Sequence, residues 1–170
     1  MKKLLTPMGS AALALGACFA VTLTAMAQGS GSPAAVDHSQ DAAWQNSQQA
    51  ALASRAASGE WQSLDDGLLW RRIAGDGSGA HPAVSDTVTV HYAGTLVDGT
   101  PFDSSFDRGE PATFPLGRLI PAWQAAIPQM GVGDTIEIAA PSGVAYGPRG
   151  KGPIPGGATL LFTIQLLGIE

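Results

Sequence analysis

The chain has little cysteine and few basic residues. Cys18 is the only cysteine among its 170 residues, and 9 Lys and Arg stand against 14 Asp and Glu. A single thiol cannot form a disulfide within the chain, and removal of a leader containing Cys18 would leave no thiol for catalysis. An acidic chain without a basic stripe argues against nucleic-acid binding. The three histidines, His38, His81 and His91, lack the spacing of a metal site, so we expect no metal.

Residues 1–27 have the pattern of a secretory signal peptide. Two lysines near the start precede an apolar run over residues 4–23, and Ala25-Met26-Ala27 places small residues at the two positions that a signal peptidase reads. We predict cleavage after Ala27 and export across the inner membrane, to a bacterial periplasm. The alternative is an uncleaved membrane anchor, although the proline and glycines of the run disfavour a stable spanning helix.

A second alternative concerns Cys18 itself. Leu15-Gly16-Ala17-Cys18 resembles a lipoprotein box, in which Cys18 would become the lipidated first residue. Residues 19–27 remain mostly apolar, whereas the tether that follows such a cysteine is usually polar, so cleavage after Ala27 is favoured. This cleavage leaves 7 basic and 14 acidic residues, and the formal net charge falls from −5 to −7 because two lysines and no acidic residue are lost.

Residues 28–66 are predicted to be a linker and a helix. Residues 28–35 are rich in Gly, Ser and Pro, which is typical of a flexible linker. Residues 37–58 are rich in Ala and Gln, which favour helix, but Trp44 has no large apolar neighbour at helical spacing before Leu52. Two interpretations stay open: a weakly stable helix or tether, or a helix that forms a weak dimer or contacts client proteins.

Residues 67–170 are predicted to form one domain built mainly of strands. Apolar and polar residues alternate in four stretches, as in strands with one buried face: residues 67–73, 88–96, 135–139 and 158–169. Residues 112–116 are short and extended. The connections are too short for βαβ crossovers, so the pattern predicts an antiparallel sheet packed on a helix.

One convincing helix is expected within the domain. Four apolar residues follow the spacing i, i+3, i+4 and i+7 of a single helical face: Trp123, Ala126, Ile127 and Met130. Pro121 suits the first turn, where its missing N–H costs nothing. Pro128 removes a hydrogen bond and clashes with the preceding turn, so we expect a short helix that ends near Ile127.

Several spaced motifs of this domain resemble the FKBP family of peptidyl-prolyl cis-trans isomerases. They are VHYAGTLVDGTPFDSS, LIPAWQAAIPQMGVGD, AYGPRGKGPIPGGATLLF and the LLGIE ending, in the family's order. The resemblance implies an α+β fold in which a twisted antiparallel β-sheet half-wraps around one short α-helix, here preceded by an amino-terminal extension. It also implies isomerisation of X–Pro bonds in unfolded or partly folded polypeptides without a cofactor, and inhibition by macrolides.

The resemblance also implies which residues form the site. Those of the catalytic pocket are Tyr92, Phe102, Asp103, Trp123, Tyr146 and Phe162, and those that bind substrate are Arg108, Leu119, Ile120 and Ile154. In the family, Trp123 would form the floor of the proline pocket, the Tyr146 hydroxyl and the Ile120 N–H would donate to substrate carbonyls, and Asp103 would pair with Arg108. Ile154 is the one large apolar residue of a Gly- and Pro-rich loop over residues 146–157, and we expect it to cover something.

Each assignment has a simpler alternative. Buried aromatic residues are by default part of the core, and Asp103 with Arg108 could be a solvated surface pair of little energetic weight. The same pocket could also belong to a non-catalytic chaperone module that only binds proline-containing clients.

Three features depart from the family pattern. Ala112 stands where many members have a further pocket aromatic, which predicts a wider or shallower pocket on that side. The segment between Gly117 and Trp123 is two residues shorter than in the familiar eukaryotic members. Arg149 and Lys151 make the covering loop basic. These features bear on substrate preference and macrolide affinity more than on activity.

Overall fold

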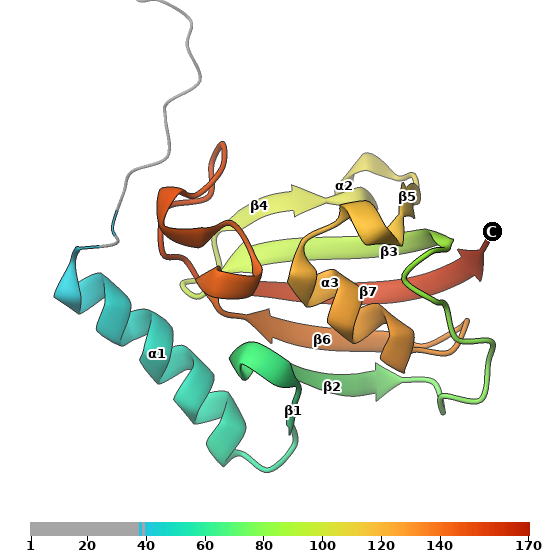
Figure 1. Cartoon of the computed structure of the whole chain (residues 1–170), viewed down its shortest axis with the longest axis horizontal. Helices are drawn as coiled ribbons and strands as arrows, with labels where there is room; N and C mark the ends of the chain where they lie inside the picture. Colours follow the sequence, from blue (N-terminus) through green and yellow to red (C-terminus); the bar gives the residue numbers. More distant parts are fainter. Residues whose placement is uncertain (1–37, 39) are drawn as a thin grey trace, which may run out of the picture. The chain divides into compact units, whose positions relative to one another are not determined.

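The structure, a computed structural model, describes residue 38 and residues 40–170 (Figure 1). The predicted signal peptide, residues 1–27, and the predicted linker, residues 28–35, lie outside these residues. In the part of the chain that the structure describes, no helix combines the length and hydrophobicity required to cross a bilayer.

Seven strands form one antiparallel sheet, as the sequence predicted. The strands are β1 (Gln62–Ser63), β2 (Leu69–Ala74), β3 (Thr87–Leu96), β4 (Pro101–Ser104), β5 (Ala112–Pro115), β6 (Thr135–Ala140) and β7 (Leu160–Ile169). Their order is β1-β2-β6-β7-β3-β4, and β5 also pairs with β3. β1 pairs with β2, so the sheet begins five residues before residue 67, where we placed the start of the domain.

Strand β3 connects the sheet to the segment that carries most of the predicted site. Its side chains alternate between buried and half-buried along its whole length, with Val88, Val90 and Tyr92 on the buried face. A turn through Asp98-Gly99 follows, in which Gly99 has a φ of +87° that favours glycine. The chain then returns as β4 along one end of β3, and β5 pairs with the other end of the same edge.

Between β4 and β5 lies a one-turn helix, α2 (Ser105–Arg108), which the sequence analysis did not predict. The Ser104 hydroxyl accepts a hydrogen bond from the Asp107 N–H at 3.1 Å and so caps the turn. Gly109 ends it in the left-handed conformation, with φ at +74°. A helix of four residues is too short to show a periodic apolar face, so hydrophobic patterning alone could not detect it.

The predicted helix over the sheet is present and short. It is α3 (Pro121–Ala126), followed by a 3-10 turn, η3 (Ile127–Gln129), that contains Pro128. The prediction that the helix ends near Ile127 is confirmed. Figure 1 shows α3 lying across one face of the sheet. Its buried side chains form one apolar core with those of the strands: Trp123, Ala126, Ile127 and Met130 from the helical segment, and Val90, Ile136, Ile138 and Ile164 from the sheet.

The amino-terminal extension contains a helix that packs on the domain. This helix, α1 (Ala42–Ala57), starts at the N-cap Asp41, whose carboxylate accepts a hydrogen bond from the Trp44 N–H. Trp44 is partly buried against the core, and Gln48 is fully enclosed. Near the other end of α1, the Arg55 guanidinium lies over the ring of Trp61. Residues 42–57 are therefore a packed helix rather than a tether.

Candidate active site

A cavity of about 230 Å³ opens between the sheet, α3 and the loop that follows β6. It is lined by Tyr92, Phe102, Asp103, Phe114, Leu119, Ile120, Trp123, Tyr146 and Phe162. Eight of the ten residues that the sequence analysis selected therefore come together at one place. Arg108 and Ile154 are not among the lining residues, and Phe114 was not selected.

The base of the cavity is a set of aromatic rings that meet edge to face. The ring of Trp123 is 5.2 Å from that of Tyr92 and 5.4 Å from that of Phe162, at interplanar angles of 81° and 86°. Phe102 in turn meets Phe162 at 5.5 Å and 87°. Such perpendicular contacts add to the stabilisation from burial and fix the ring orientations. Tyr92, Trp123 and Phe162 are thus both core residues and pocket residues, so the two interpretations of these aromatics are compatible.

Phe114 completes the wall on the side of Ala112. The two residues alternate with exposed neighbours along β5 and share its half-buried face. The ring of Phe114 lies 6.2 Å from Tyr92 and 6.4 Å from Trp123. An aromatic side chain therefore lines the side on which Ala112 predicts a wider pocket. The alternation within residues 112–115 was the signal that could have identified Phe114.

A polar network of three side chains lies at the rim of the cavity. The Tyr92 hydroxyl donates to Oδ2 of Asp103 at 2.5 Å, while Nη2 of Arg108 donates to the Tyr92 oxygen at 3.1 Å. Arg108 also forms an ion pair with Oδ1 of Asp103. Both charged side chains are about half exposed, so the ion pair by itself adds little stability. Arg108 is not among the lining residues, and its effect on the cavity is to hold the side chains of Tyr92 and Asp103 in place.

The network determines which groups are charged. Partial burial alone would raise the pKa of Asp103, but hydrogen bonds from Tyr92 and Arg108 outweigh burial and lower this pKa below its usual range. Burial, followed by the hydrogen bond to Asp103, raises the pKa of the Tyr92 hydroxyl. Burial also raises the pKa of Tyr146, with the charge of Asp103 adding to it. At neutral pH the cavity thus contains one carboxylate and two protonated phenols.

Three hydrogen-bond donors of residues that line the cavity have no acceptor within the described residues: the hydroxyl of Tyr146, the backbone N–H of Ile120 and the buried indole N–H of Trp123. The Ile120 N–H belongs to the same peptide group as the Leu119 carbonyl, which accepts a hydrogen bond from Nε2 of Gln124 at 2.8 Å. In a trans peptide the N–H points opposite to the carbonyl, so Gln124 fixes the direction of the Ile120 donor. The cavity therefore offers donors for carbonyl groups of a bound molecule.

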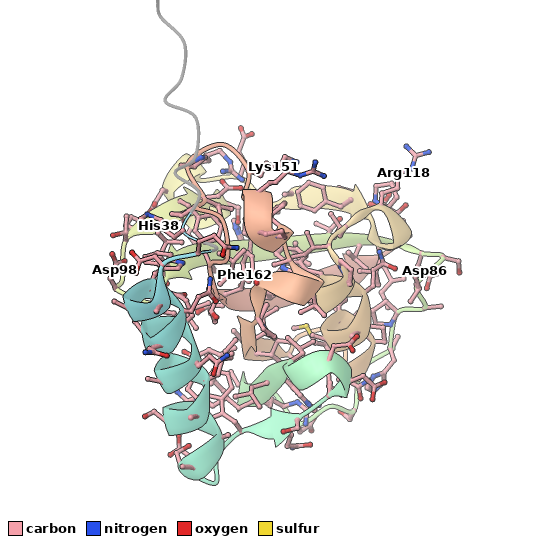
Figure 2. The ribbon with its side chains drawn as sticks, turned by 60° about the vertical axis from the view of Figure 1, so that its left-hand side comes forward. His38, Asp86, Asp98, Arg118, Lys151 and Phe162 are labelled. Carbon is pink, nitrogen blue, oxygen red and sulfur yellow. The ribbon has the colours of Figure 1, made fainter. Side chains whose placement is uncertain are left out.

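The loop over residues 146–157 forms a closed structure beside the cavity. The Gly157 N–H donates to the Gly147 carbonyl at 3.0 Å, and Lys151 and Ile154 exchange two backbone hydrogen bonds nearer the tip. Ile154 is buried in the core and is not among the residues that line the cavity, and its assignment to substrate binding stays a prediction. Figure 2 shows Lys151 on the outside of this loop, whereas Phe162 lies in the interior.

Residues 79–167 match the family model described as FKBP-type peptidyl-prolyl cis-trans isomerase. The chain belongs to this family. The match covers β3 to β6 and most of β7, and it includes every residue that lines the cavity.

Several FKBP proteins are similar to the chain. The "FKBP-type peptidyl-prolyl cis-trans isomerase FkpA" of Aeromonas hydrophila is 48% identical over 119 residues, which are 70% of this chain and 44% of that protein. The "Outer membrane protein MIP" of Legionella longbeachae is 47% identical over 108 residues, 63% of this chain and 46% of that protein. The crystal structure of FkpA from Escherichia coli superimposes with a TM-score of 0.73 at 35% identity, covering 77% of this chain and 62% of that one. The chain thus spans less than half the length of these two curated relatives.

The described residues contain no set of side chains arranged to bind a metal ion. Residue 38 and residues 40–170 contain no group of three or more His, Cys, Asp and Glu side chains placed to hold an ion. What the FKBP cavity provides instead is apolar surface with donors at its edge.

Gly94 packs tightly against two aromatic rings that line the cavity, those of Phe102 and Phe162. A Cβ atom at this position would lie 2.5 Å from Cζ of Phe102 and 3.1 Å from Cε1 of Phe162. We expect Gly94→Ala to displace the Phe102 ring and to lower kcat/KM for an X–Pro peptide roughly tenfold, which is equivalent to about 1.4 kcal/mol of transition-state stabilisation. Gly168→Ala on β7 is the matched control, because a Cβ there meets no atom within 4 Å. Equal rates for the two variants would show that the position of Phe102 does not matter.

Proposed function

We propose that the chain is a peptidyl-prolyl cis-trans isomerase that acts on X–Pro bonds of exported polypeptides. This proposal rests on the combination, in one cavity, of aromatic rings packed edge to face with two donors, Tyr146 Oη and Ile120 N, that have no acceptor among residues 38 and 40–170. An apolar floor suits the proline ring, and the donors suit the peptide carbonyls on either side of it.

The mechanism needs no covalent step. Amide resonance sets a barrier of about 18–20 kcal/mol to rotation about the X–Pro bond. Water stabilises the planar amide through its carbonyl, so a cavity that excludes water and fits the twisted amide favours the transition state over the ground state. Tyr92, Phe102, Trp123 and Phe162 would enclose the proline.

The polar groups would then orient the peptide. Tyr146 and Ile120 would hold the flanking carbonyls through hydrogen bonds, with Leu119 beside them. The charged carboxylate of Asp103, held by Arg108, would act on the twisted amide electrostatically and transfer no proton. Because Arg108 pairs with Asp103 and donates to Tyr92, its role is to position these two side chains.

The decisive experiment measures isomerisation of a short X–Pro peptide by the chain that begins at Gln28, with and without a macrolide ligand of the family. Acceleration that the macrolide blocks supports the proposal and places the reaction at this cavity. Acceleration that the macrolide does not block supports the enzyme with an altered pocket near Ala112. A folded sample that binds the peptide without accelerating isomerisation would replace the proposal with the non-catalytic chaperone module.

We also propose that the chain is divided into a signal peptide at residues 1–27, a linker and helix at residues 28–66, and an isomerase domain at residues 67–170. Export is supported by the sequence pattern of the first segment and by the name of the Legionella relative, which is an outer membrane protein. The first residue of the protein recovered from the periplasm or membrane decides the processing. Gln28 supports cleavage by signal peptidase, and a lipidated Cys18 supports the lipoprotein alternative.

A weak dimer through residues 37–58 is part of the same proposal. It would use the outer side of α1, because Trp44 and Gln48 already pack on the chain's own domain. Sedimentation of the chain from Gln28 as a monomer at all concentrations would exclude it.

A further inference from the structure

A buried hydrogen bond connects the amino-terminal helix to the isomerase domain. Oε1 of Gln48 on α1 accepts from the backbone N–H of Thr159 at 2.8 Å. Both residues are nearly inaccessible, at 3% and 2% relative exposure. A glutamine buried on a helix whose exposed face is polar has to be explained, because burying an amide without a partner is costly. Its partner, Thr159, is 111 residues further along the chain, beside the active site.

The Thr159 N–H depends on this partner. The strand β7 begins at Leu160, and its neighbours end opposite that residue, with Ala140 of β6 and Leu96 of β3 as its partners. Thr159 thus lies just beyond both ladders, where no neighbouring strand offers a carbonyl, and a buried N–H must find another acceptor. Gln48 provides it from outside the sheet.

The orientation of the Gln48 amide is set on α1 itself. Its Nε2 donates to the Ser47 hydroxyl at 3.1 Å, and this hydroxyl donates to the Trp44 carbonyl at 2.7 Å. With its nitrogen engaged on the helix, the amide presents its oxygen to Thr159. The helix itself therefore holds the acceptor oxygen of Gln48 in the orientation that the hydrogen bond to Thr159 requires.

Thr159 stands at the root of the covering loop. Two residues earlier, the Gly157 N–H closes the loop on the Gly147 carbonyl, next to Tyr146. Three residues later, Phe162 lines the cavity. The hydrogen bond from α1 thus holds the chain at Thr159, between the closure of the loop at Gly157 and the cavity residue Phe162.

We propose that Gln48 is a positioning residue of the active site, through which α1 fixes the root of the covering loop and thereby the Tyr146 hydroxyl. The inference deepens the proposed function and rests on it. It makes the amino-terminal helix part of the catalytic unit, although α1 contributes no residue to the cavity lining.

The test uses the whole chain from Gln28 with Gln48→Met, which keeps the length of the side chain and removes the acceptor oxygen. Gln49→Met is the matched control, because Gln49 is the exposed neighbour on the same helix. We expect Gln48→Met to lower kcat/KM roughly tenfold, since small displacements of a positioned group have effects of this size, and Gln49→Met to leave it unchanged. Gln48→Glu retains an acceptor oxygen and is expected to restore part of the loss.

Two further readouts distinguish positioning from a structural role. Amide hydrogen exchange in residues 146–159 is expected to accelerate in Gln48→Met and not in Gln49→Met. In addition, Tyr146→Phe should reduce the rate of the parent chain but add little in the Gln48→Met background, because residues that act through one group are not additive.

The outcomes separate the inference from the proposed function. Faster exchange confined to α1, with an unchanged rate, would reduce Gln48 to an anchor of the helix and overturn the inference. Fully additive effects with Tyr146→Phe would also overturn it. If the parent chain does not accelerate isomerisation at all, the proposed function fails, and faster exchange of the loop in Gln48→Met still supports the physical coupling.

Discussion

Replacing Trp123 with alanine is expected to lower kcat/KM for X–Pro isomerisation on the order of 100-fold, or about 2.7 kcal/mol of transition-state stabilisation. Trp123 is 4% exposed and forms the meeting point of the rings of Tyr92, Phe114 and Phe162. Its removal leaves the cavity without a floor, admits water, and lets the neighbouring rings leave their perpendicular arrangement. The substrate amide would then be solvated during rotation, which is the condition that the pocket has to prevent.

The same substitution must also affect stability, so a control is needed. Loss of a buried tryptophan lowers the free energy of unfolding by about 3–5 kcal/mol. Trp70 on β2 is similarly buried, at 6% exposure, and is not among the residues that line the cavity. We expect Trp70→Ala to lower stability to a comparable extent, measured by denaturant unfolding, while the rate per folded molecule remains near that of the parent. If the two variants lose activity in parallel, the site is not at Trp123.

The strands and the main helix could be predicted because their causes are local. In β3, polar residues alternate with Val88, Val90 and Tyr92, so the sequence alone indicates which face of the strand is buried. Pro128 limits α3 because it cannot donate to the preceding turn, and the helix ends where this effect begins. Each of these features depends on a few neighbouring residues and on no distant contact.

The features that were missed depend on distant contacts. Besides the contact of Trp44 with the core, the packing of α1 relies on Gln48 and the backbone of Thr159, two polar groups that a hydrophobic pattern does not reveal. The alternation along β5 places Phe114 on a half-buried face, but this face meets the cavity only because β5 pairs with the same edge of β3 as β4 does. Ile154 lies in the buried core, and the path of the loop decides whether such a residue lines a cavity or enters the core. The resemblance to the FKBP family indicated which residues belong to the site, but it could not show where α1, Phe114 and Ile154 pack in this chain.

The second large effect is expected at Asp103. We expect Asp103→Asn to lower kcat/KM by more than tenfold at neutral pH, which is over about 1.4 kcal/mol. Asparagine keeps the shape and one acceptor oxygen but removes the charge that holds Arg108 and faces the cavity. Asp107→Asn is the control on the same segment, because Asp107 is an exposed residue of α2 that does not line the cavity. Identical kcat/KM values for the two variants would show that the charge of Asp103 does not contribute to the rate.

The pH dependence provides an independent test of the same residue. Hydrogen bonds from Tyr92 and Arg108, which outweigh burial, lower the pKa of Asp103 in the folded protein. Its contribution to stability is therefore complete above the pKa of the unfolded chain, and is lost as the pH falls through the lower folded value. The rate of the parent chain should stay constant as the pH falls to the usual range of carboxyl groups, and decline only below it, while folding is followed by fluorescence. Asp103→Asn should lack this decline, because it has no proton to gain at that position. A parent rate that falls already well above that range would mean that another group controls the reaction, and the role assigned to the Asp103 network would then have to be given up.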